Sequence, residues 1–204
     1  MKRQNEQDMT FEAAQIGAPA LDDDAVLVRR FLAGDDSAFD SLYERYYPKV
    51  YALTRGILGD NEDALDAVQA TFVQVWKNLA RFQHRSRFST WLYRISVNTA
   101  IQHARRVSRR RDTEPLEESH VGEVVEEHSA DPLGERVAAA LVRLREEDRA
   151  VLSLYYWEEQ SLEQIAEVLG CTANAAKTRL YRARERFRAA WSELESQHET
   201  EQHS

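Results

Sequence analysis

One narrow helical face in the middle of the chain carries side chains suited to contact with phosphates and base edges. At about 100° per residue, the positions that share this face are Arg94, Asn98, Gln102, Arg105 and Arg109. Guanidinium groups bind phosphate oxygens, and amide side chains can pair with the edges of bases. The chemistry predicted for this face is therefore recognition of a nucleic acid.

A second basic surface is predicted near the C-terminus, on a helix that follows a tight turn. Ser161 and Gln164 have capping-box spacing at the start of a short apolar helix, and Gly170 ends it. Thr172 can cap the next helix, whose outward side chains include Lys177, Thr178, Tyr181 and Arg182. This order is typical of a helix-turn-helix, whose second helix fits the major groove of DNA. An amphipathic helix pair of a structural bundle is the alternative interpretation.

The formal net charge of −8 hides a separation of charge along the chain. Residues 67–111 contain no Asp or Glu, whereas residues 112–135 contain no Lys or Arg. A further basic cluster occupies residues 177–188, interrupted only by Glu185. Basic faces on an acidic protein indicate binding of a polyanion, although solvated helix faces are the alternative.

Composition limits the class of protein. The 204 residues include 43% hydrophobic and 30% charged side chains, with 7 glycines and 4 prolines, as in a helix-rich globular protein. No apolar run reaches the roughly 20 residues that span a bilayer, and no signal-peptide core follows Met1. A single cysteine, Cys171, excludes an internal disulfide. We therefore expect a cytoplasmic protein without membrane insertion.

The sequence contains no motif for catalysis. We therefore expect that the protein is not an enzyme and that it binds neither a cofactor nor a metal ion. Nucleophile elbows, phosphate-binding loops and dinucleotide fingerprints are missing. The candidate metal ligands lie in the acidic segment and form two sets: Glu117, Glu118 and His120, and Glu126, Glu127 and His128. A solvated linker explains these residues better than a metal site does.

Apolar spacing predicts an all-α fold of two small helical domains, residues 21–111 and 131–192. A flexible acidic linker over 112–130 joins them, a flexible extension covers 1–20, and a polar tail covers 193–204. In the first domain we expect a short helix that stops at Gly34 and a longer one that bends at Pro48. The stripe predicted to face inward on the third helix consists of Leu65, Val68, Phe72, Val75, Trp76 and Leu79. Ser89 or Thr90 can cap the fourth helix.

Three segments in order resemble the extracytoplasmic-function (ECF) sigma factors, a family of RNA polymerase subunits. They are Asp66-Ala67-Val68-Gln69-Ala70-Thr71-Phe72, residues 88–100 (FSTWLYRISVNTA) and residues 176–184 (AKTRLYRAR). The resemblance covers about Leu21 to Trp191. It implies that residues 21–111 form a sigma region 2 bundle and that residues 131–192 form a sigma region 4 helix-turn-helix.

The resemblance also implies a function: an alternative sigma factor that binds core RNA polymerase and directs promoter-specific initiation. Asp66, Gln69 and Phe72 are then expected to contact a coiled coil of the polymerase's largest subunit. Phe82 and Asn98 are expected to border a pocket for a flipped base of the minus-10 element, beside Arg94, Gln102, Arg105 and Arg109. Phe72 and Phe82 could instead be core residues, and Asp66 could complement the helix N-terminus.

The family's readers of the minus-35 element correspond to Lys177, Thr178, Tyr181 and Arg182, with Arg179 and Arg184 expected on phosphates. The chain departs from the family pattern at Ala70, where an acid is usual. It also departs at Ala175-Ala176, where Thr-Val is usual, so one expected contact of the recognition helix is missing.

The resemblance implies three partners: core RNA polymerase, promoter DNA and an anti-sigma factor. A stand-alone helix-turn-helix regulator, whose first domain dimerises or senses a ligand, is the alternative function. A further hypothesis is that the acidic residues 117–127 fold back on the basic surfaces when polymerase is absent.

Overall fold

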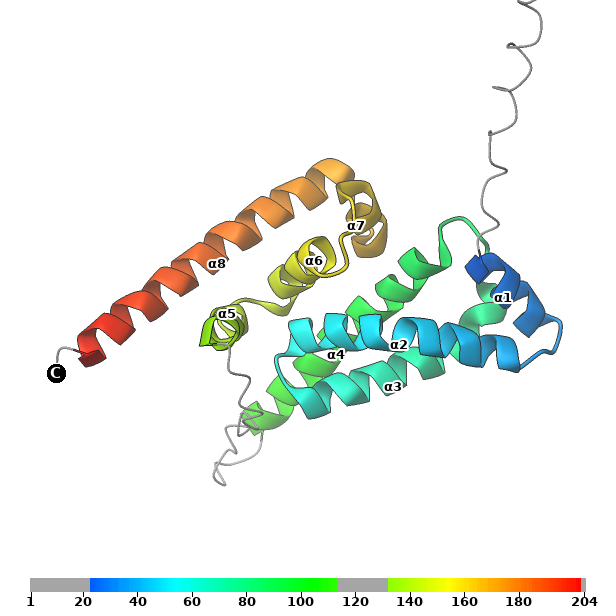
Figure 1. Ribbon diagram of the computed structural model, residues 1–204, viewed down its shortest axis with the longest axis horizontal. Helices are drawn as coiled ribbons and strands as arrows, with labels where there is room; N and C mark the ends of the chain where they lie inside the picture. The colour runs from blue at the N-terminus through cyan, green and yellow to red at the C-terminus, as the bar shows by residue number, and fades with distance from the viewer. Residues whose placement is uncertain (1–22, 114–131, 203–204) are drawn as a thin grey trace, which may run out of the picture. The chain divides into compact units, whose positions relative to one another are not determined.

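The computed structural model describes residues 23–113 and 132–202, and every regular element in these ranges is a helix. The chain divides into two compact units, residues 1–42 and 43–204. The elements are α1 (Asp23–Leu32), α2 (Ser37–Leu58), α3 (Asn61–Asn78), the 3₁₀ helix η1 (Leu79–Arg81), α4 (Phe88–Thr113), α5 (Pro132–Val142), α6 (Glu146–Tyr156), α7 (Leu162–Leu169) and α8 (Ala173–Gln202) (Figure 1). The all-α prediction is confirmed. The predicted extension 1–20 and most of the predicted linker 112–130 lie outside the described residues.

Local contacts define the turn between α1 and α2 in the first unit. Gly34 ends α1 at φ 94°, a conformation that glycine adopts without strain. Arg30 pairs with Asp35 at 2.7 Å, and the Ser37 hydroxyl donates to the same carboxylate at 2.6 Å. The Ser37 and Arg30 hydrogen bonds hold the pKa of Asp35 below its ordinary value. The Phe31 and Phe39 rings, 5.5 Å apart, pack across the turn.

Polar contacts join α3 to α4 in the second unit, which also contains most of α2. Pro48 lies inside α2, which continues through it to Leu58. Asp60 caps α3 by accepting from the Asp63 amide at 2.9 Å. Between α3 and α4, His103 Nε2 lies 2.6 Å from the Asp63 carboxylate, and the Gln74 amide donates to the Thr99 hydroxyl at 3.3 Å.

The predicted inward stripe on α3 is wrong at two positions. Val68, Phe72, Val75 and Leu79 are buried, but Leu65 and Trp76 are 46% and 45% exposed. The inward face of α3 is instead completed by the smaller Ala64, Ala67 and Thr71. These small side chains centre the buried face on Ala64, Val68 and Val75, so Leu65 and Trp76 lie at its exposed edge beside Phe72.

The C-terminal helices α5 to α8 contain the predicted helix-turn-helix. The capping box at α7 is present, because Ser161 N donates to Gln164 Oε1 at 2.8 Å and Gln164 N donates to Ser161 Oγ at 3.3 Å. Gly170 ends α7 at φ 62°, and Thr172 Oγ1 accepts from the Ala175 amide at 3.2 Å. Ser161 therefore caps α7 and Thr172 caps α8, which confirms the predicted start of each helix.

Helix α8 continues through the residues expected to form a polar tail. Arg136 of α5 pairs with Glu195 at 3.4 Å, and Arg143, directly after α5, pairs with Glu193 at 3.5 Å. The Arg136 guanidinium also lies over the Trp191 ring, 4.6 Å from its centroid. Two ion pairs and one cation–π contact therefore hold the C-terminal part of α8 against α5 and the residue that follows it.

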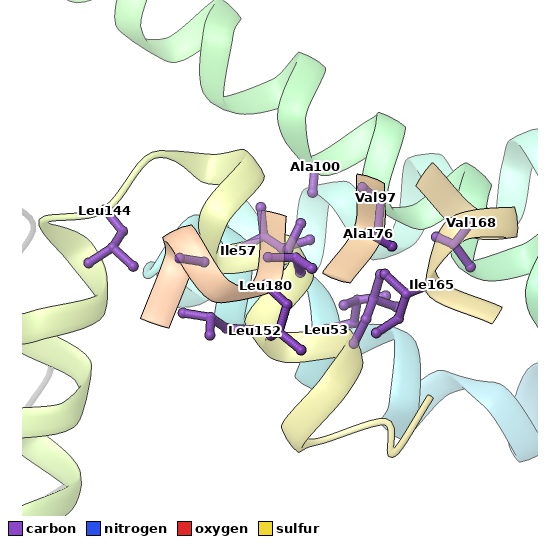
Figure 2. Close-up of a cluster of buried hydrophobic side chains, with 14 of the residues drawn as sticks. Leu53, Ile57, Val97, Ala100, Leu144, Leu152, Ile165, Val168, Ala176 and Leu180 are labelled. Carbon is purple, nitrogen blue, oxygen red and sulfur yellow. The ribbon is translucent and has the colours of Figure 1, made fainter. Parts of the chain in front are cut away.

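A cluster of buried side chains joins α2 and α4 to the C-terminal helices of the second unit. Leu53 and Ile57 of α2 and Val97 and Ala100 of α4 join side chains from α5 to α8 in this cluster (Figure 2). The contributions from α7 and α8 labelled in Figure 2 are Ile165, Val168, Ala176 and Leu180. Within the described ranges, no helix combines the length and apolar character that crossing a membrane requires.

Candidate polymerase and nucleic-acid interfaces

The α4 face, defined as Arg94, Asn98, Gln102, Arg105 and Arg109, is exposed along its whole length, as predicted from helical spacing. The opposite side of α4 is buried through Leu92, Ser96 and Thr99, and the Ser96 hydroxyl is satisfied by the Leu92 carbonyl at 2.9 Å. Packing on that side fixes the rotation of α4. The five polar side chains therefore form one continuous, cationic strip.

Two guanidinium groups of the α4 face already have partners on the C-terminal helices. Arg94 Nε donates to the Glu167 carbonyl of α7 at 3.1 Å, and a second nitrogen of the same guanidinium donates to the same oxygen. Arg105 pairs with Glu147 of α6 at 2.9 Å. Arg109 Nε donates to the Arg105 carbonyl at 3.1 Å.

Phe82 lies at the base of an aromatic cluster before α4. It is only 7% exposed, and its ring packs against His84, Phe88 and Trp91 with centroids 4.6, 6.0 and 5.2 Å away. His84 is exposed at φ 52°, and Trp91 is half-buried. The accessible aromatic surface here belongs to His84 and Trp91, which the sequence prediction missed, although both lie in the segment that carries the resemblance or directly before it.

The α3 face combines polar and apolar side chains on the exposed side of α3. Its members are the neighbours Leu65 and Asp66, followed at intervals of three or four residues by Gln69, Val73 and Trp76. Leu65, Val73 and Trp76 are 46%, 45% and 45% exposed, which is unusual for apolar side chains grouped on one helix. Phe72, predicted with Asp66 and Gln69, is buried and packs on the Tyr43 ring at 4.6 Å.

The α8 face comprises the exposed residues near the start of α8. They are Lys177, Thr178, Arg179, Tyr181 and Arg182, with Tyr181 63% exposed. Leu180 and Ala183 are buried beneath them, so the face is held by the core of the helix-turn-helix. The Thr178 hydroxyl donates to the Asn174 carbonyl at 3.0 Å, which leaves its methyl group and an acceptor lone pair for a ligand.

Arg184 differs from the other predicted readers because aromatic rings of α6 surround it. Its guanidinium lies 4.9 Å from the Tyr155 ring centroid and 5.4 Å from that of Tyr156. Its Nε is buried without a hydrogen-bond partner. The structure therefore does not bring the guanidinium of Arg184 together with the α8 face.

A partly buried carboxyl group lies where α4 meets the C-terminal helices. The Tyr93 hydroxyl donates to the Glu158 carboxylate. Burial raises the pKa of Glu158, and the Tyr93 hydrogen bond and the charge of Lys49 oppose that rise. Sequence reasoning did not identify this pair, because 65 residues separate its members.

Comparisons with known proteins match both halves of this description. Residues 42–110 match the family model described as Sigma-70 region 2, and residues 134–187 match Sigma-70, region 4. The chain is 33% identical over 174 residues to the RNA polymerase sigma-H factor of Pseudomonas aeruginosa, covering 79% of this chain and 90% of that protein. It is 34% identical over 174 residues to the ECF RNA polymerase sigma-E factor of Haemophilus influenzae, covering 79% and 92%.

Solved structures give the same fold. The structure of CnrH in complex with the cytosolic domain of CnrY aligns at a TM-score of 0.62 and 27% identity, covering 82% of this chain and 96% of that one. The sigma factor RpoE from Bartonella quintana, solved with the anti-sigma factor NepR, aligns at 0.58 and 21% identity, covering 76% and 96%.

Proposed function

The chain belongs to the ECF RNA polymerase sigma factors, and on this premise we propose a division of labour between its two matched regions. Region 2 docks on core polymerase through the α3 face and opens the minus-10 element along the α4 face. Region 4 reads the minus-35 element through the α8 face. The observation that supports this proposal most strongly is the pair of separate, exposed cationic helix faces on an otherwise acidic chain.

The α3 face suits a protein partner better than a nucleic acid. Its apolar side chains can be buried on docking, while Asp66 and Gln69 supply polar contacts that set orientation. A carboxylate would repel the phosphates of DNA. We assign this face to the coiled coil of the polymerase's largest subunit. An acidic side chain is usual in the family at the position of Ala70, and apolar contacts of Leu65, Val73 and Trp76 compensate for its absence here.

The α4 face suits a single strand with one base turned out of the stack. Arginines on both sides of Asn98 neutralise phosphates, and the Asn98 amide can pair with the edge of an unpaired base. His84 and Trp91 offer aromatic surface for stacking, and buried Phe82 supports both rings. In this assignment Phe82 is a positioning residue.

The α8 face suits the major groove of a duplex. Lysine and arginine reach guanine acceptors, and the exposed Tyr181 ring can contact a thymine methyl group. Arg179 is assigned to a phosphate. For Arg184 we retain only a supporting role, because two tyrosine rings contact its guanidinium.

We further propose control by an anti-sigma factor. CnrH, the structural relative at 27% identity, was solved with the cytosolic domain of CnrY. A protein that covers the α3 face would prevent docking on polymerase. The protein then acts in the cytoplasm with the polymerase and catalyses no reaction of its own.

Reconstituted transcription tests this proposal. Purified protein mixed with core polymerase is expected to give run-off transcripts from a subset of genomic promoter fragments, and core polymerase alone is expected to give none. Specific, tight binding to duplex DNA without polymerase, together with no transcript from any fragment, would favour the stand-alone helix-turn-helix regulator instead.

A further inference from the structure

The basic cluster of residues 177–188 divides into two halves with different surroundings. The basic residues of the first half are exposed on the α8 face, and they are Lys177, Arg179 and Arg182. Those of the second half each contact a partner on the protein itself, and they are Arg184, Arg186 and Arg188. Charge alone would assign both halves to DNA, so the partners of the second half need a separate explanation.

Arg186 of α8 pairs with Asp148 of α6. One guanidinium nitrogen, Nη1, donates to both carboxylate oxygens of Asp148, at 2.7 and 2.6 Å. Asp148 is 7% exposed, whereas the side chain of Arg186 is 50% exposed. A half-exposed guanidinium can be solvated by water, but a buried carboxylate needs a counter-charge. The structure therefore commits Arg186 to α6.

Helix α6 provides a well-packed support for this pair. Ala150 and Leu154 are fully buried, and Val151 and Leu152 are 1% and 4% exposed. Asp148 lies in the first turn of α6, where the positive end of the helix dipole stabilises a carboxylate. Helix α6 packs against α8 (Figure 1). The packing of α6 therefore fixes the position of the carboxylate that Arg186 binds.

Arg184 makes a second contact between the same two helices. Its guanidinium lies 4.9 Å from the Tyr155 ring centroid and 5.4 Å from that of Tyr156. Tyr155 follows Asp148 by seven residues, about two turns of helix, so α8 is held at two separate points of α6. Apolar packing has no preferred direction, whereas these polar contacts do. Together they fix the rotation of α8 about its axis.

The rotation of α8 decides where its exposed side chains point. Arg186 follows Arg182 by four residues, about one turn of helix. Hydrogen bonds to base edges weaken steeply when their geometry changes, whereas attraction to a phosphate declines slowly with distance. A less firmly held α8 would therefore lose discrimination between bases before it loses affinity for DNA in general.

We propose that Asp148 is a specificity-determining positioning residue, which holds Arg186 and so fixes the orientation of the recognition helix. Arg186 then anchors α8 on α6 and contacts no DNA phosphate. The proposal rests on the assignment of the α8 face to the minus-35 element under the proposed function. It adds to the determinants of base choice a buried residue of α6 that touches no base.

The salt dependence of DNA binding tests whether Arg186 contacts a phosphate. The affinity of the full-length protein for a fluorescent duplex of mixed sequence is measured from about 50 to 200 mM salt, and each phosphate contact adds about 0.9 to the slope of log K against log salt. Arg186→Ala is expected to keep the wild-type slope, whereas the matched variant Arg179→Ala is expected to lower it. An equal decrease for the two variants would overturn the assignment of Arg186 to α6.

Base discrimination tests the positioning. The affinity of the holoenzyme is compared for a promoter with its own minus-35 element and for the same promoter with that element scrambled. Asp148→Ala is expected to reduce the ratio of the two affinities by about tenfold. Arg186→Ala and the double variant are expected to show the same reduction, because either substitution breaks the pair. An unchanged ratio for Asp148→Ala, or additive losses in the double variant, would contradict the proposal.

Two further variants separate positioning from stability. Because a single nitrogen makes both hydrogen bonds, the ammonium of Arg186→Lys can replace it, and discrimination is expected to stay within about twofold of the wild type. Ser161→Ala loses the cap of α7 and is the control for reduced stability alone. A loss of discrimination in Ser161→Ala as large as that in Asp148→Ala would assign the effect to stability and refute the positioning role.

The double variant guards against a folding defect. Arg186→Ala alone leaves the carboxylate of Asp148 buried without its partner, whereas Asp148→Ala/Arg186→Ala leaves no such charge. If the wild-type holoenzyme does not distinguish the two promoters, the proposed reading of the minus-35 element fails, and the specificity role of Asp148 fails with it. The salt experiment uses the free protein and a mixed sequence, so it still decides whether Arg186 serves α6 or DNA.

Discussion

Arg182 and Arg184 lie two residues apart on α8 and have different surroundings. Arg182 is exposed on the α8 face, whereas the guanidinium of Arg184 contacts Tyr155 and Tyr156. Neighbouring arginines of one helix can therefore have separate roles, one in recognition and one in packing.

Arg182→Ala is expected to reduce discrimination at one minus-35 base by about 1–3 kcal/mol, because a guanidinium reads guanine acceptors. The measurement is holoenzyme affinity for promoters that carry each base at each upstream position. Arg179→Ala is the matched variant, and it is expected to weaken binding to all sequences equally. A uniform loss for Arg182→Ala would identify that residue as a phosphate contact.

Glu158, which accepts a hydrogen bond from Tyr93, is expected to make the stability of the protein depend on pH. Its pKa is raised by burial, so the folded state favours the protonated carboxyl. Its contribution to stability is fully present below the pKa of an exposed glutamate and is lost as pH rises through the raised value. Glu158→Gln is therefore expected to raise Tm near neutral pH and to match the wild type near pH 4.

Thermal melts across this pH range check the effect of Glu158→Gln. Glu159→Gln, at an exposed neighbouring position, is the control and is expected to follow the wild type at every pH. Parallel curves for Glu158→Gln and the wild type would show that burial of this carboxyl has no energetic consequence.

At the scale of elements, the helix-turn-helix depends on its caps. Ser161→Ala is expected to lower the free energy of unfolding by about 1 kcal/mol, because the backbone N–H of Gln164 loses the Ser161 hydroxyl as its acceptor. Urea denaturation measures this loss. Ser192→Ala, at an exposed position inside α8, is the control, with a change expected within about 0.5 kcal/mol. Equal losses for both variants would contradict the role of the cap.

Helix α3 has a buried side and an exposed side, and substitutions can separate packing on the first from the docking proposed for the second. Trp76→Ala is expected to weaken binding to core polymerase by about 2 kcal/mol, because exposed aromatic side chains often dominate interfaces. Val75→Ala, one residue away but fully buried, is expected to lower stability instead. Polymerase titration and urea denaturation distinguish the two. Unchanged polymerase affinity for Trp76→Ala would remove Trp76 from the docking surface.

Local sequence patterns predicted where helices begin and end better than they predicted which side of each helix is buried. The capping box at Ser161 and the stop at Gly170 follow from neighbouring residues, so both were predictable. Leu65 and Trp76 were assigned to the wrong side, because hydrophobicity cannot separate a core position from a docking surface. Phe82 was given two interpretations, and its burial favours a supporting role.

At the scale of the whole molecule, long-range contacts set what is accessible. Arg94 and Glu167 are 73 residues apart, and no periodicity in the sequence links them. The α4 face was predictable as a basic helix, but the contacts of Arg94 with α7 and of Arg105 with α6 were not. The acidic segment 117–127, proposed from the sequence to fold back on the basic surfaces, lies outside the described residues.

The division of labour between the α4 and α8 faces is the central claim, and promoter melting tests it most directly. Asn98→Ala holoenzyme is compared with wild type on one promoter, with permanganate reactivity reporting open thymines and nuclease protection reporting the minus-35 contact. We expect Asn98→Ala to lose permanganate reactivity while keeping upstream protection. Normal melting by Asn98→Ala, or loss of both signals in equal proportion, would contradict the account.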